Sequence, residues 1–298
     1  MLSFLPGCIM FPLHLTLQML NLSFWALLII LLGLLKLALP ITAITKLINF
    51  LLNHMLCAFG TMSVALLKLT NNITLDYQVD GELSKRAWYL LMSNHLSWLD
   101  IILLTEFAVG RIPAPKFFLK KELIWLPFVG LGAWALDMPF MQRYSGAFLK
   151  SNPHLKGKDI ETTRKSCDKF RQLPTTVINF VEGSRYTSEK HRLLASPFER
   201  LLRPKAGGIA FTLASMGELF TNILDVTILY PENTGSPMLN MLAGRLTRVV
   251  IRVKVLPIDE HIMGDYFNDE HFKSTFQAWL NELWLDKDKL IQQLQGNK

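Results

Sequence analysis

One histidine of this sequence has a carboxylate at a spacing that could support base catalysis. His95 follows a short apolar run, and Asp100 stands five residues further along the chain. On a regular helix the two side chains would point about 140° apart, so they can meet only if His95 precedes a helix and Asp100 lies in its first turn. A carboxylate beside an imidazole fixes the tautomer of the ring and stabilises its charged form, so His95 could act as a general base.

The same residues also have a purely structural interpretation. Ser97 is a good N-cap residue, and Ser97 with Asp100 three positions later resembles a capping box, so Asp100 could simply help to cap a helix that begins at Ser97. The local pattern alone favours this second interpretation, although a helix beginning there would leave His95 free just outside it. The other histidines lie in apolar segments or polar stretches and indicate no chemistry: His14, His54, His154, His191, His261 and His271.

A second candidate group follows a β-branched run and reads Phe-Val-Glu-Gly-Ser-Arg at residues 180–185. Gly183 permits close approach of the backbone to a ligand, and Arg185 can hold an anionic group with paired donors. An ordinary turn with a solvated arginine is the alternative.

Basic residues also stand beside an apolar run further upstream. They would suit an anionic headgroup at a membrane surface, but a solvated face with lysines lying along it fits the composition better. These residues are Arg111, Lys116, Lys120 and Lys121.

Composition excludes several classes of protein. Half of the 298 residues are hydrophobic and 18% are charged, so the chain is not disordered. The formal net charge of +7 suits anionic partners. Cys8, Cys57 and Cys167 lie far apart and show neither a disulfide framework nor metal-ligand spacing. No glycine-rich loop follows a strand-like segment, so a dinucleotide or Walker-type site has no support.

The first quarter of the chain has the composition of a membrane anchor. Residues 1–70 contain three lysines and no Arg, Asp or Glu. Residues 13–35 are uncharged and long enough for a spanning helix, which needs about 20 apolar residues. Lys36 follows this stretch, and the uncharged start does not resemble a signal peptide. We therefore predict a retained anchor whose C-terminal side is cytoplasmic.

A second apolar stretch covers residues 47–67, between Lys46 and Lys68. It could span the membrane, or lie in the interface with its polar residues on one side. A buried core helix is the less favoured alternative, because no apolar partner segment of similar length is evident. The sequence predicts membrane-anchoring segments over residues 1–70 and a second domain over residues 71–298.

The rest of the chain alternates between strand-like and helix-like segments. Strand patterns occupy residues 73–79, 87–93, 175–181, 225–230 and 247–256. Helical patterns occupy residues 159–172, 204–216 and the C-terminal end around 272–283. Strands that alternate with helices predict an α/β fold in which helices cover a sheet.

Three segments taken together resemble a known family. They read Asn94-His95-x4-Asp100, then Lys120-x2-Leu123-x3-Pro127-x2-Gly130, then the segment at residues 180–185. In order and spacing they resemble the glycerolipid acyltransferase family of lysophosphatidic acid acyltransferases, and the resemblance covers about residues 85–232. It is closest to a subgroup with long membrane segments that includes a bacterial inner-membrane member. It implies a mixed sheet flanked by helices, with an N-terminal membrane helix or a two-helix membrane anchor.

Three positions depart from the family pattern. Val181 and Ser184 replace the usual Pro and Thr of the third segment, and Met138 stands where a glycine usually precedes Arg143. The resemblance implies that these positions shape the side of the site that receives the acyl acceptor.

The resemblance also implies an activity. A fatty acyl group would pass from acyl-CoA or acyl-carrier protein to the sn-2 hydroxyl of lysophosphatidic acid, giving phosphatidic acid. His95 would be the general base and Asp100 its orienting partner, while Lys120 and Arg185 would hold the phosphate. The full set of implied substrate-binding residues is Lys120, Arg143, Glu182, Gly183, Ser184 and Arg185.

The same resemblance implies the setting of the enzyme. Its partners would be a lysophospholipid and the acyl donor, with no metal, no other cofactor and no nucleic acid. It would lie in a bacterial inner membrane, with the catalytic domain on the cytoplasmic side.

Alternatives stay open at this stage. The acceptor could be another lysophospholipid, as in phospholipid remodelling. A serine or lipid hydrolase using His95 would want a Gly-x-Ser-x-Gly elbow, which does not occur in the sequence. A catalytically silent membrane interaction protein would be expected to have lost His95 or Asp100, and both are present.

Overall fold

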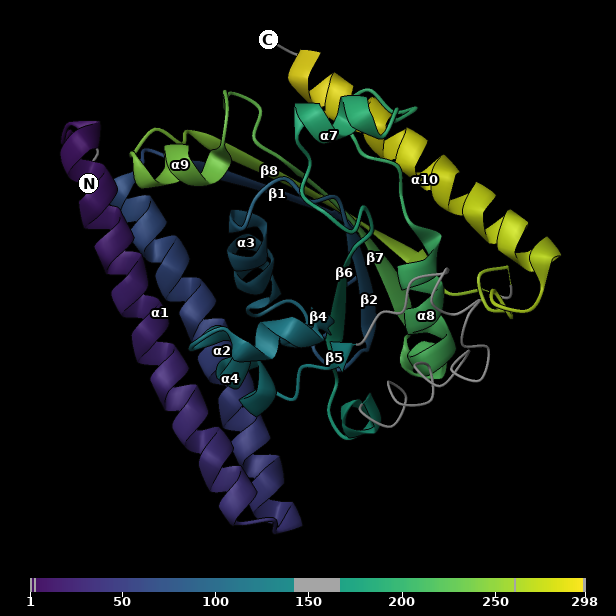
Figure 1. The fold of residues 1–298 in the computed structure, drawn as a ribbon, viewed down its shortest axis with the longest axis horizontal. Coiled ribbons are helices and arrows are strands. Elements are labelled where there is room, and N and C mark those ends of the chain that lie inside the picture. Colours follow the sequence, from purple (N-terminus) through teal and green to yellow (C-terminus); the bar gives the residue numbers. More distant parts are fainter. Residues whose placement is uncertain (1, 3, 142–166, 260, 297–298) are drawn as a thin grey trace.

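A computed structural model describes residues 2, 4–141, 167–259 and 261–296. Its centre is a six-stranded sheet with the order β1-β8-β7-β2-β6-β3 (Figure 1). Neighbouring strands run parallel except β7 and β8, which are antiparallel, so the sheet is mixed, as the resemblance implied. The strands are β1 (Thr74–Asp80), β2 (Tyr89–Ser93), β3 (Pro115–Phe117), β6 (Thr176–Phe180), β7 (Asn222–Leu229) and β8 (Arg248–Pro257).

Helices cover both faces of this sheet, as the burial of strand β2 shows. All five of its residues are buried, as in parallel strands that are covered on both sides. Its side chains alternate, with Tyr89 and Leu91 in one hydrophobic core and Leu90 and Met92 in the other. Helices α1 (Gly7–Ala38), α2 (Thr42–Thr70), α3 (Leu99–Ala108) and α4 (Val129–Ala135) cover the first core, and α8 (Ala206–Met216) and α10 (Glu270–Gly296) cover the second (Figure 1).

Shorter elements complete the described chain. They are the paired strands β4 (Leu119–Lys120) and β5 (Phe140–Met141), helices α7 (Ser188–Leu193) and α9 (Pro237–Leu242), and 3₁₀ helices over Lys121–Trp125, Asp168–Arg171 and Gly217–Leu219.

The pattern-based predictions of these elements can now be compared with the fold. Each predicted strand is present, although β7 begins at Asn222, before the predicted start. The helices predicted over residues 204–216 and at the C-terminal end are confirmed as α8 and α10. The helix predicted over residues 159–172 lies mostly outside the described residues, and its described end forms the 3₁₀ helix Asp168–Arg171.

The sheet brings distant segments to one edge. Strands β2, β6 and β7 run in the same direction, so their C-terminal ends lie together. His95 follows β2, the segment at residues 180–185 includes the end of β6, and Tyr230 follows β7. In open α/β sheets ligands bind outside the carboxyl ends of the strands, so this edge is where a site is expected.

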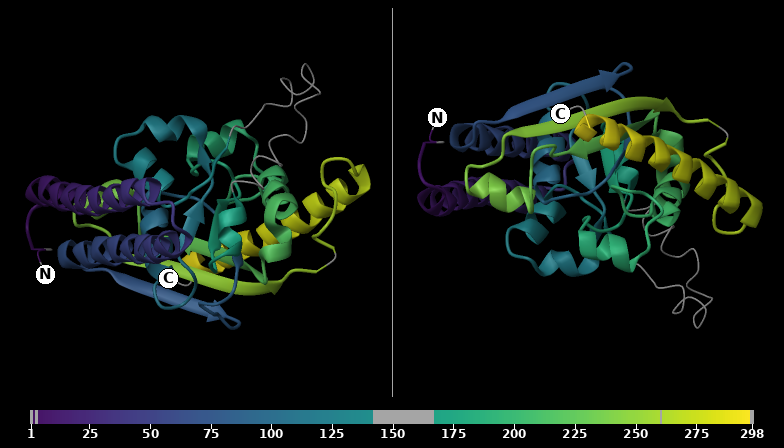
Figure 2. Two further views of the ribbon diagram at one scale, coloured as in Figure 1. Left: turned by 90° about the horizontal axis from the view of Figure 1, so that it is seen from below. Right: turned by 90° about the horizontal axis from the view of Figure 1, so that it is seen from above.

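Helices α1 and α2 form an antiparallel pair, side by side in Figure 2, and both are long and apolar enough to cross a membrane. Polar side chains meet inside the pair: Gln18 donates to the Ser63 carbonyl over 3.1 Å, and Asn21 donates to the Ser63 hydroxyl over 2.8 Å. The argument that residues 47–67 lack an apolar partner was wrong, because α1 is that partner. The pair packs on α3 and α4 and contributes Leu52 and Leu67 to the core that it shares with the sheet.

Two buried or nearly buried lysines tie this helix pair to the rest of the protein. Lys36 Nζ on α1 lies 2.8 Å from the Asp137 carboxylate and donates to the Ala135 carbonyl over 2.8 Å. Lys116 Nζ on β3 donates to the Asn53 side chain on α2 over 2.8 Å. Lys36, which in the sequence resembles a flanking cation of a membrane helix, is therefore part of an internal polar contact.

Close packing of α2 on α3 depends on Gly60. A Cβ at this position would lie 2.8 Å from the Thr105 methyl carbon and 3.1 Å from the Glu106 nitrogen. Because overpacking costs about 1–3 kcal/mol, Gly60→Ala should lower the melting temperature of the detergent-solubilised protein. Gly132→Ala on α4 is the matched control, since its added Cβ meets nothing within 4 Å among the described atoms. Equal melting temperatures for the two variants would contradict this packing.

Candidate active site

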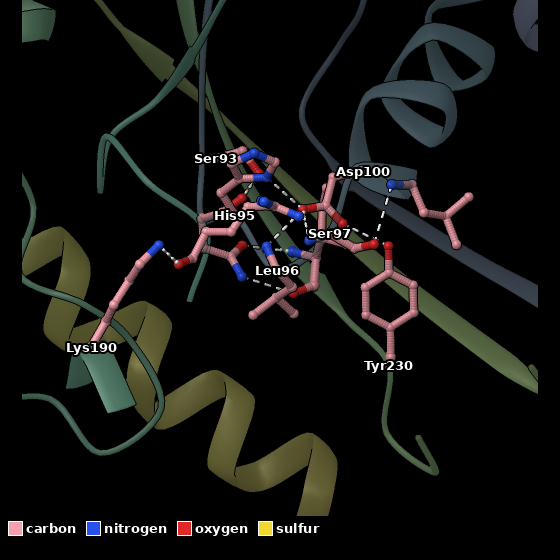
Figure 3. Close-up of polar contacts among 11 residues, drawn as sticks. Ser93, His95, Leu96, Ser97, Asp100, Lys190 and Tyr230 are labelled. Carbon is pink, nitrogen blue, oxygen red and sulfur yellow. Dashed lines mark hydrogen bonds and ion pairs between the residues drawn. The ribbon is translucent and has the colours of Figure 1, made fainter. Parts of the chain in front are cut away.

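The loop between β2 and α3 brings His95 and Asp100 together. His95 Nδ1 lies 2.8 Å from Asp100 Oδ2, because α3 begins only at Leu99 and Asp100 occupies its first turn (Figure 3). The helix therefore starts two residues after the predicted Ser97, and the Ser97 hydroxyl accepts from the Leu99 nitrogen over 3.3 Å. His95 and Asp100 therefore meet in the way that base catalysis would need. Their catalytic role stays a prediction.

Asp100 combines both interpretations that the sequence left open. Its Oδ2 accepts backbone N–H groups of Leu96 at 2.7 Å and of Ser97 at 2.8 Å, in addition to the His95 contact. Its Oδ1 accepts the Tyr230 hydroxyl at 2.6 Å. The carboxylate is 0% exposed, so these donors replace water around the charge. Asp100 thus holds the turn before α3 and contacts the imidazole with the same oxygen.

Tyr230 is the residue that the sequence analysis missed. In the sequence it is only the last residue of the strand pattern over residues 225–230. It reaches Asp100 because β7 pairs with β2 in parallel, with Val226 opposite Ser93. The strand prediction contained one usable signal: residues that follow parallel strands meet at one edge of a sheet.

The imidazole of His95 is held in one orientation. It stacks on Phe180 with ring centroids 3.9 Å apart and an angle of 15° between the planes. In its other contacts Asp100 is always the hydrogen-bond acceptor. The His95 Nδ1 must therefore be the donor in their contact and carry the ring proton. In the neutral tautomer with this Nδ1 proton, Nε2 is the nitrogen that can accept a proton from a substrate.

The loop after β6 packs against the histidine loop. The Tyr186 nitrogen donates to the His95 carbonyl over 2.7 Å, and the Arg185 guanidinium lies 4.9 Å from the centroid of the Trp98 ring. Gly183 has a φ of +69°, a conformation that glycine adopts without strain. Ser184 is half-buried. The structure thus brings Arg185 beside the histidine loop, so two of the three segments on which the family resemblance rests lie next to each other.

Glu182 lies in the interior rather than on the surface of this loop. It is 1% exposed, and neither carboxylate oxygen has a hydrogen-bond partner among the described residues. Burial raises the pKa of Glu182 to about 8, and the Leu202 backbone and then Lys287 oppose this shift only in part. The side chain is therefore neutral near pH 7 and supports the loop from within.

Two predicted residues cannot be placed in full. The backbone of Lys120 ends β4, next to Met141 of β5, but its side chain and the whole of Arg143 lie outside the described residues. Within the described residues, no three His, Cys, Asp or Glu side chains gather as metal ligands would.

Comparison with known proteins places this site in a family. A family model described as Acyltransferase matches residues 76–230, which is more than half of the chain. The chain belongs to the Acyltransferase family. Its matched region contains β2, β6 and β7, and with them His95, Asp100, Arg185 and Tyr230.

Several members of the Acyltransferase family are similar at the level of sequence. The 1-acyl-sn-glycerol-3-phosphate acyltransferase 3 of Arabidopsis thaliana is 25% identical over 74% of this chain and 58% of its own length. The 1-acyl-sn-glycerol-3-phosphate acyltransferase delta of Homo sapiens is 25% identical over 67% of this chain and 51% of its own length. The chain spans about half the length of these relatives.

A solved acyltransferase structure has the same fold. The crystal structure of the 1-acyl-sn-glycerophosphate (LPA) acyltransferase PlsC from Thermotoga maritima covers 93% of this chain and 97% of its own, with a TM-score of 0.51 and 16% identity. The likeness extends beyond the matched family region and includes the mixed sheet flanked by helices.

Loss of the Tyr230 hydroxyl should slow acyl transfer. Tyr230→Phe leaves one oxygen of Asp100 without its donor, and hydrogen bonds to charged groups contribute about 1.5–3 kcal/mol, so we expect a roughly tenfold or larger fall in kcat. Tyr77→Phe is the matched control, because the Tyr77 hydroxyl donates over 2.7 Å to Glu106, another carboxylate of α3. If both variants lose kcat equally, the effect is one of stability and not of the His95 site.

The raised pKa of Glu182 should make stability depend on pH. The folded protein holds a proton on Glu182 up to about pH 8, whereas the ordinary pKa is 4.5. Stability should therefore fall as pH rises between these values, by up to about 1.4 kcal/mol per pH unit. Glu182→Gln should flatten this part of the dependence, as measured by melting temperature at several pH values, while Glu189→Gln on exposed α7 should not. Parallel pH curves for the wild type and Glu182→Gln would contradict the shift.

Proposed function

We propose that this chain acylates the sn-2 hydroxyl of lysophosphatidic acid, using a fatty acyl thioester and producing phosphatidic acid. The observation that carries the proposal is His95, whose Nδ1 contacts the buried Asp100 and whose Nε2 is left as a proton acceptor. Membership of the Acyltransferase family supports acyl transfer, and the names of the relatives support this acceptor.

The proposed reaction needs only side chains and substrates. His95 Nε2 removes the proton of the acceptor hydroxyl, whose oxygen attacks the thioester carbonyl carbon. The new C–O bond forms, the C–S bond breaks, and the protonated imidazole returns the proton to the leaving thiolate. Asp100 stabilises the imidazolium between these two transfers. No metal or further cofactor takes part in this scheme.

The remaining predicted residues receive roles on the acceptor side. Arg185 and Lys120 hold the phosphate, because guanidinium and ammonium groups bind phosphate strongly. Arg143 and Ser184 complete the substrate contacts. Gly183 lets the loop pass close to the ligand, and Glu182 supports that loop from the interior.

The substrates also suit the apolar surface of the chain. The outer sides of α1 and α2 expose large hydrophobic residues, and so does the segment around α4, where Trp125 is 86% exposed. The inner side of α2 is buried from Ile48 to Thr70, along nearly its whole length. We propose that this apolar surface contacts the membrane, in a bacterial inner membrane with the catalytic edge on the cytoplasmic side. The donor is acyl-CoA or acyl-carrier protein.

The test is transfer by the purified, detergent-solubilised full chain. It is offered lysophosphatidic acid, lysophosphatidylethanolamine and lysophosphatidylglycerol with each donor, and products are read by mass. Lysophosphatidic acid should be acylated fastest, and His95→Ala should reduce transfer by about 10²–10⁴-fold.

His271→Ala, at an exposed histidine of α10, controls for substitution of histidine in general. Faster acylation of another acceptor would replace the proposed substrate. Near-normal turnover by a folded His95→Ala protein would remove the mechanism.

A further inference from the structure

A cavity of about 530 Å³ lies beside the histidine loop, at the same edge of the sheet. It lies between the loop that leads from β7 to α9, the start of α7 and the last turns of α10. Its volume falls within the range of about 300–1,000 Å³ that is usual for small-molecule sites. Asn94 and Leu96 line it, but His95 between them is not among its lining residues. A ligand here would lie near the reacting groups without touching the imidazole.

The charged side chains around this cavity are all positive. Arg185, Lys190 and Arg200 line it, and no Asp or Glu does so among the described residues. A cleft lined by one sign of charge concentrates ligands of the opposite sign. Arg200 has one exposed anionic neighbour, Glu199 at 3.2 Å, which a more highly charged ligand can displace. The cavity is therefore suited to an anion with several charges.

A buried carboxylate and one exposed backbone carbonyl contact the segments that carry these cations. Asp288 on α10 is 3% exposed and accepts the backbone N–H groups of Glu199 at 2.9 Å and Arg200 at 2.7 Å. Lys190 Nζ donates to the Arg185 carbonyl over 3.1 Å, next to the histidine loop in Figure 3. The cavity is thus built by α10, which lies outside the matched family region, together with α7.

One neutral group in the wall also lacks a partner. The side-chain oxygen of Gln295, on the last turns of α10, is buried and has no hydrogen-bond partner among the described residues. An unpaired buried acceptor costs free energy unless a ligand donates to it. This oxygen has no exposed surface, so a ligand in the cavity reaches it only if the end of α10 moves.

The position of the cavity distinguishes between the two substrates of the proposed reaction. The phosphate of lysophosphatidic acid is only a few bonds from the reacting hydroxyl, so it must bind close to His95 Nε2. The phosphates of an acyl-CoA are separated from its thioester by the long pantetheine arm. A cationic cavity that His95 does not line therefore fits the acyl donor and not the acceptor.

We propose that this cavity binds the phosphate-bearing nucleotide end of acyl-CoA, with Lys190 and Arg200 as the residues that select it. The inference rests on the proposed acyl transfer. The 3′-phosphate and diphosphate of CoA supply several negative charges, which match Lys190 and Arg200. The prosthetic group of a carrier protein has a single phosphate and no adenine, so it matches the cavity less well. Arg185 also lines the cavity but stays assigned to the acceptor phosphate, so the donor assignment rests on Lys190 and Arg200.

The first experiment measures binding without turnover. The affinity of the detergent-solubilised full chain for free CoA is determined by calorimetry, with adenosine 3′,5′-bisphosphate as a competitor. Lys190→Ala with Arg200→Ala should weaken CoA binding by roughly tenfold or more, because hydrogen bonds between charged groups are the strong ones. Arg192→Ala is the matched control, since Arg192 is an exposed cation of α7 that does not line the cavity. Equal CoA affinities for the double variant and the wild type would overturn the proposal, as would an equal loss in Arg192→Ala.

The second experiment separates this site from the proposed function. In steady-state assays Arg200→Ala, which leaves the contact between Lys190 and Arg185 in place, should raise KM for acyl-CoA and leave KM for the lysophospholipid within about twofold. A rise in the acceptor KM alone would overturn the donor assignment. If CoA binds as proposed but no acceptor is acylated, the proposed function fails and the site stands. If transfer from acyl-CoA occurs and the double variant has unchanged kinetics, the function stands and the site fails.

Discussion

A carboxylate that is cut off from water must receive its hydrogen bonds from the protein, and Asp100 imposes this constraint on the whole edge of the sheet. Its donors come from the loop after β2 and from Tyr230, which follows β7. The Asp100 charge is therefore satisfied only if α3 begins, and β2 and β7 end, at the positions that they have in this fold. Removing one partner of a buried charge costs about 3–5 kcal/mol, so the contacts that orient His95 also stabilise this part of the fold.

The same requirement organises the helix pair at the start of the chain. Apolar surfaces alone would let α1 and α2 rotate or slide against one another, but Gln18 and Asn21 on α1 both reach across the pair to Ser63 on α2. Lys36 likewise has its partners on α2 and after α4, at Asn49 and Asp137. These few polar contacts select one packing of an otherwise uniform apolar surface. As a result one side of the pair belongs to the protein core and the other remains apolar and exposed.

Local periodicity was sufficient for five strands of the main sheet and for helices α8 and α10, and the spacing of His95 and Asp100 allowed the two to meet, because these features depend on residues close in sequence. Local periodicity did not predict contacts between residues that are far apart in the sequence. Tyr230 is 130 residues from Asp100, and Lys36 is 101 residues from Asp137. Nothing in the sequence near Lys36 distinguishes a cation that flanks a membrane helix from one that pairs inside the fold. The burial of Glu182 was hidden for the same reason, since the groups around it come from other elements, such as Lys287 on α10.

The strand order explains how two large substrates could reach one histidine. At the catalytic edge the loops follow the order β7, β2, β6, β3, so His95 after β2 has Tyr230 on one side and the loops of β6 and β3 on the other. The cationic cavity lies between the loop after β7 and the loop after β6, against α10, and Lys120 follows β3 in the chain. The exposed apolar segment around Trp125 also follows β3 in the chain, between β4 and α4. On the proposed reaction, the water-soluble donor therefore approaches His95 between the loops after β7 and β6. The acceptor hydroxyl and the donor thioester then meet at the His95 imidazole.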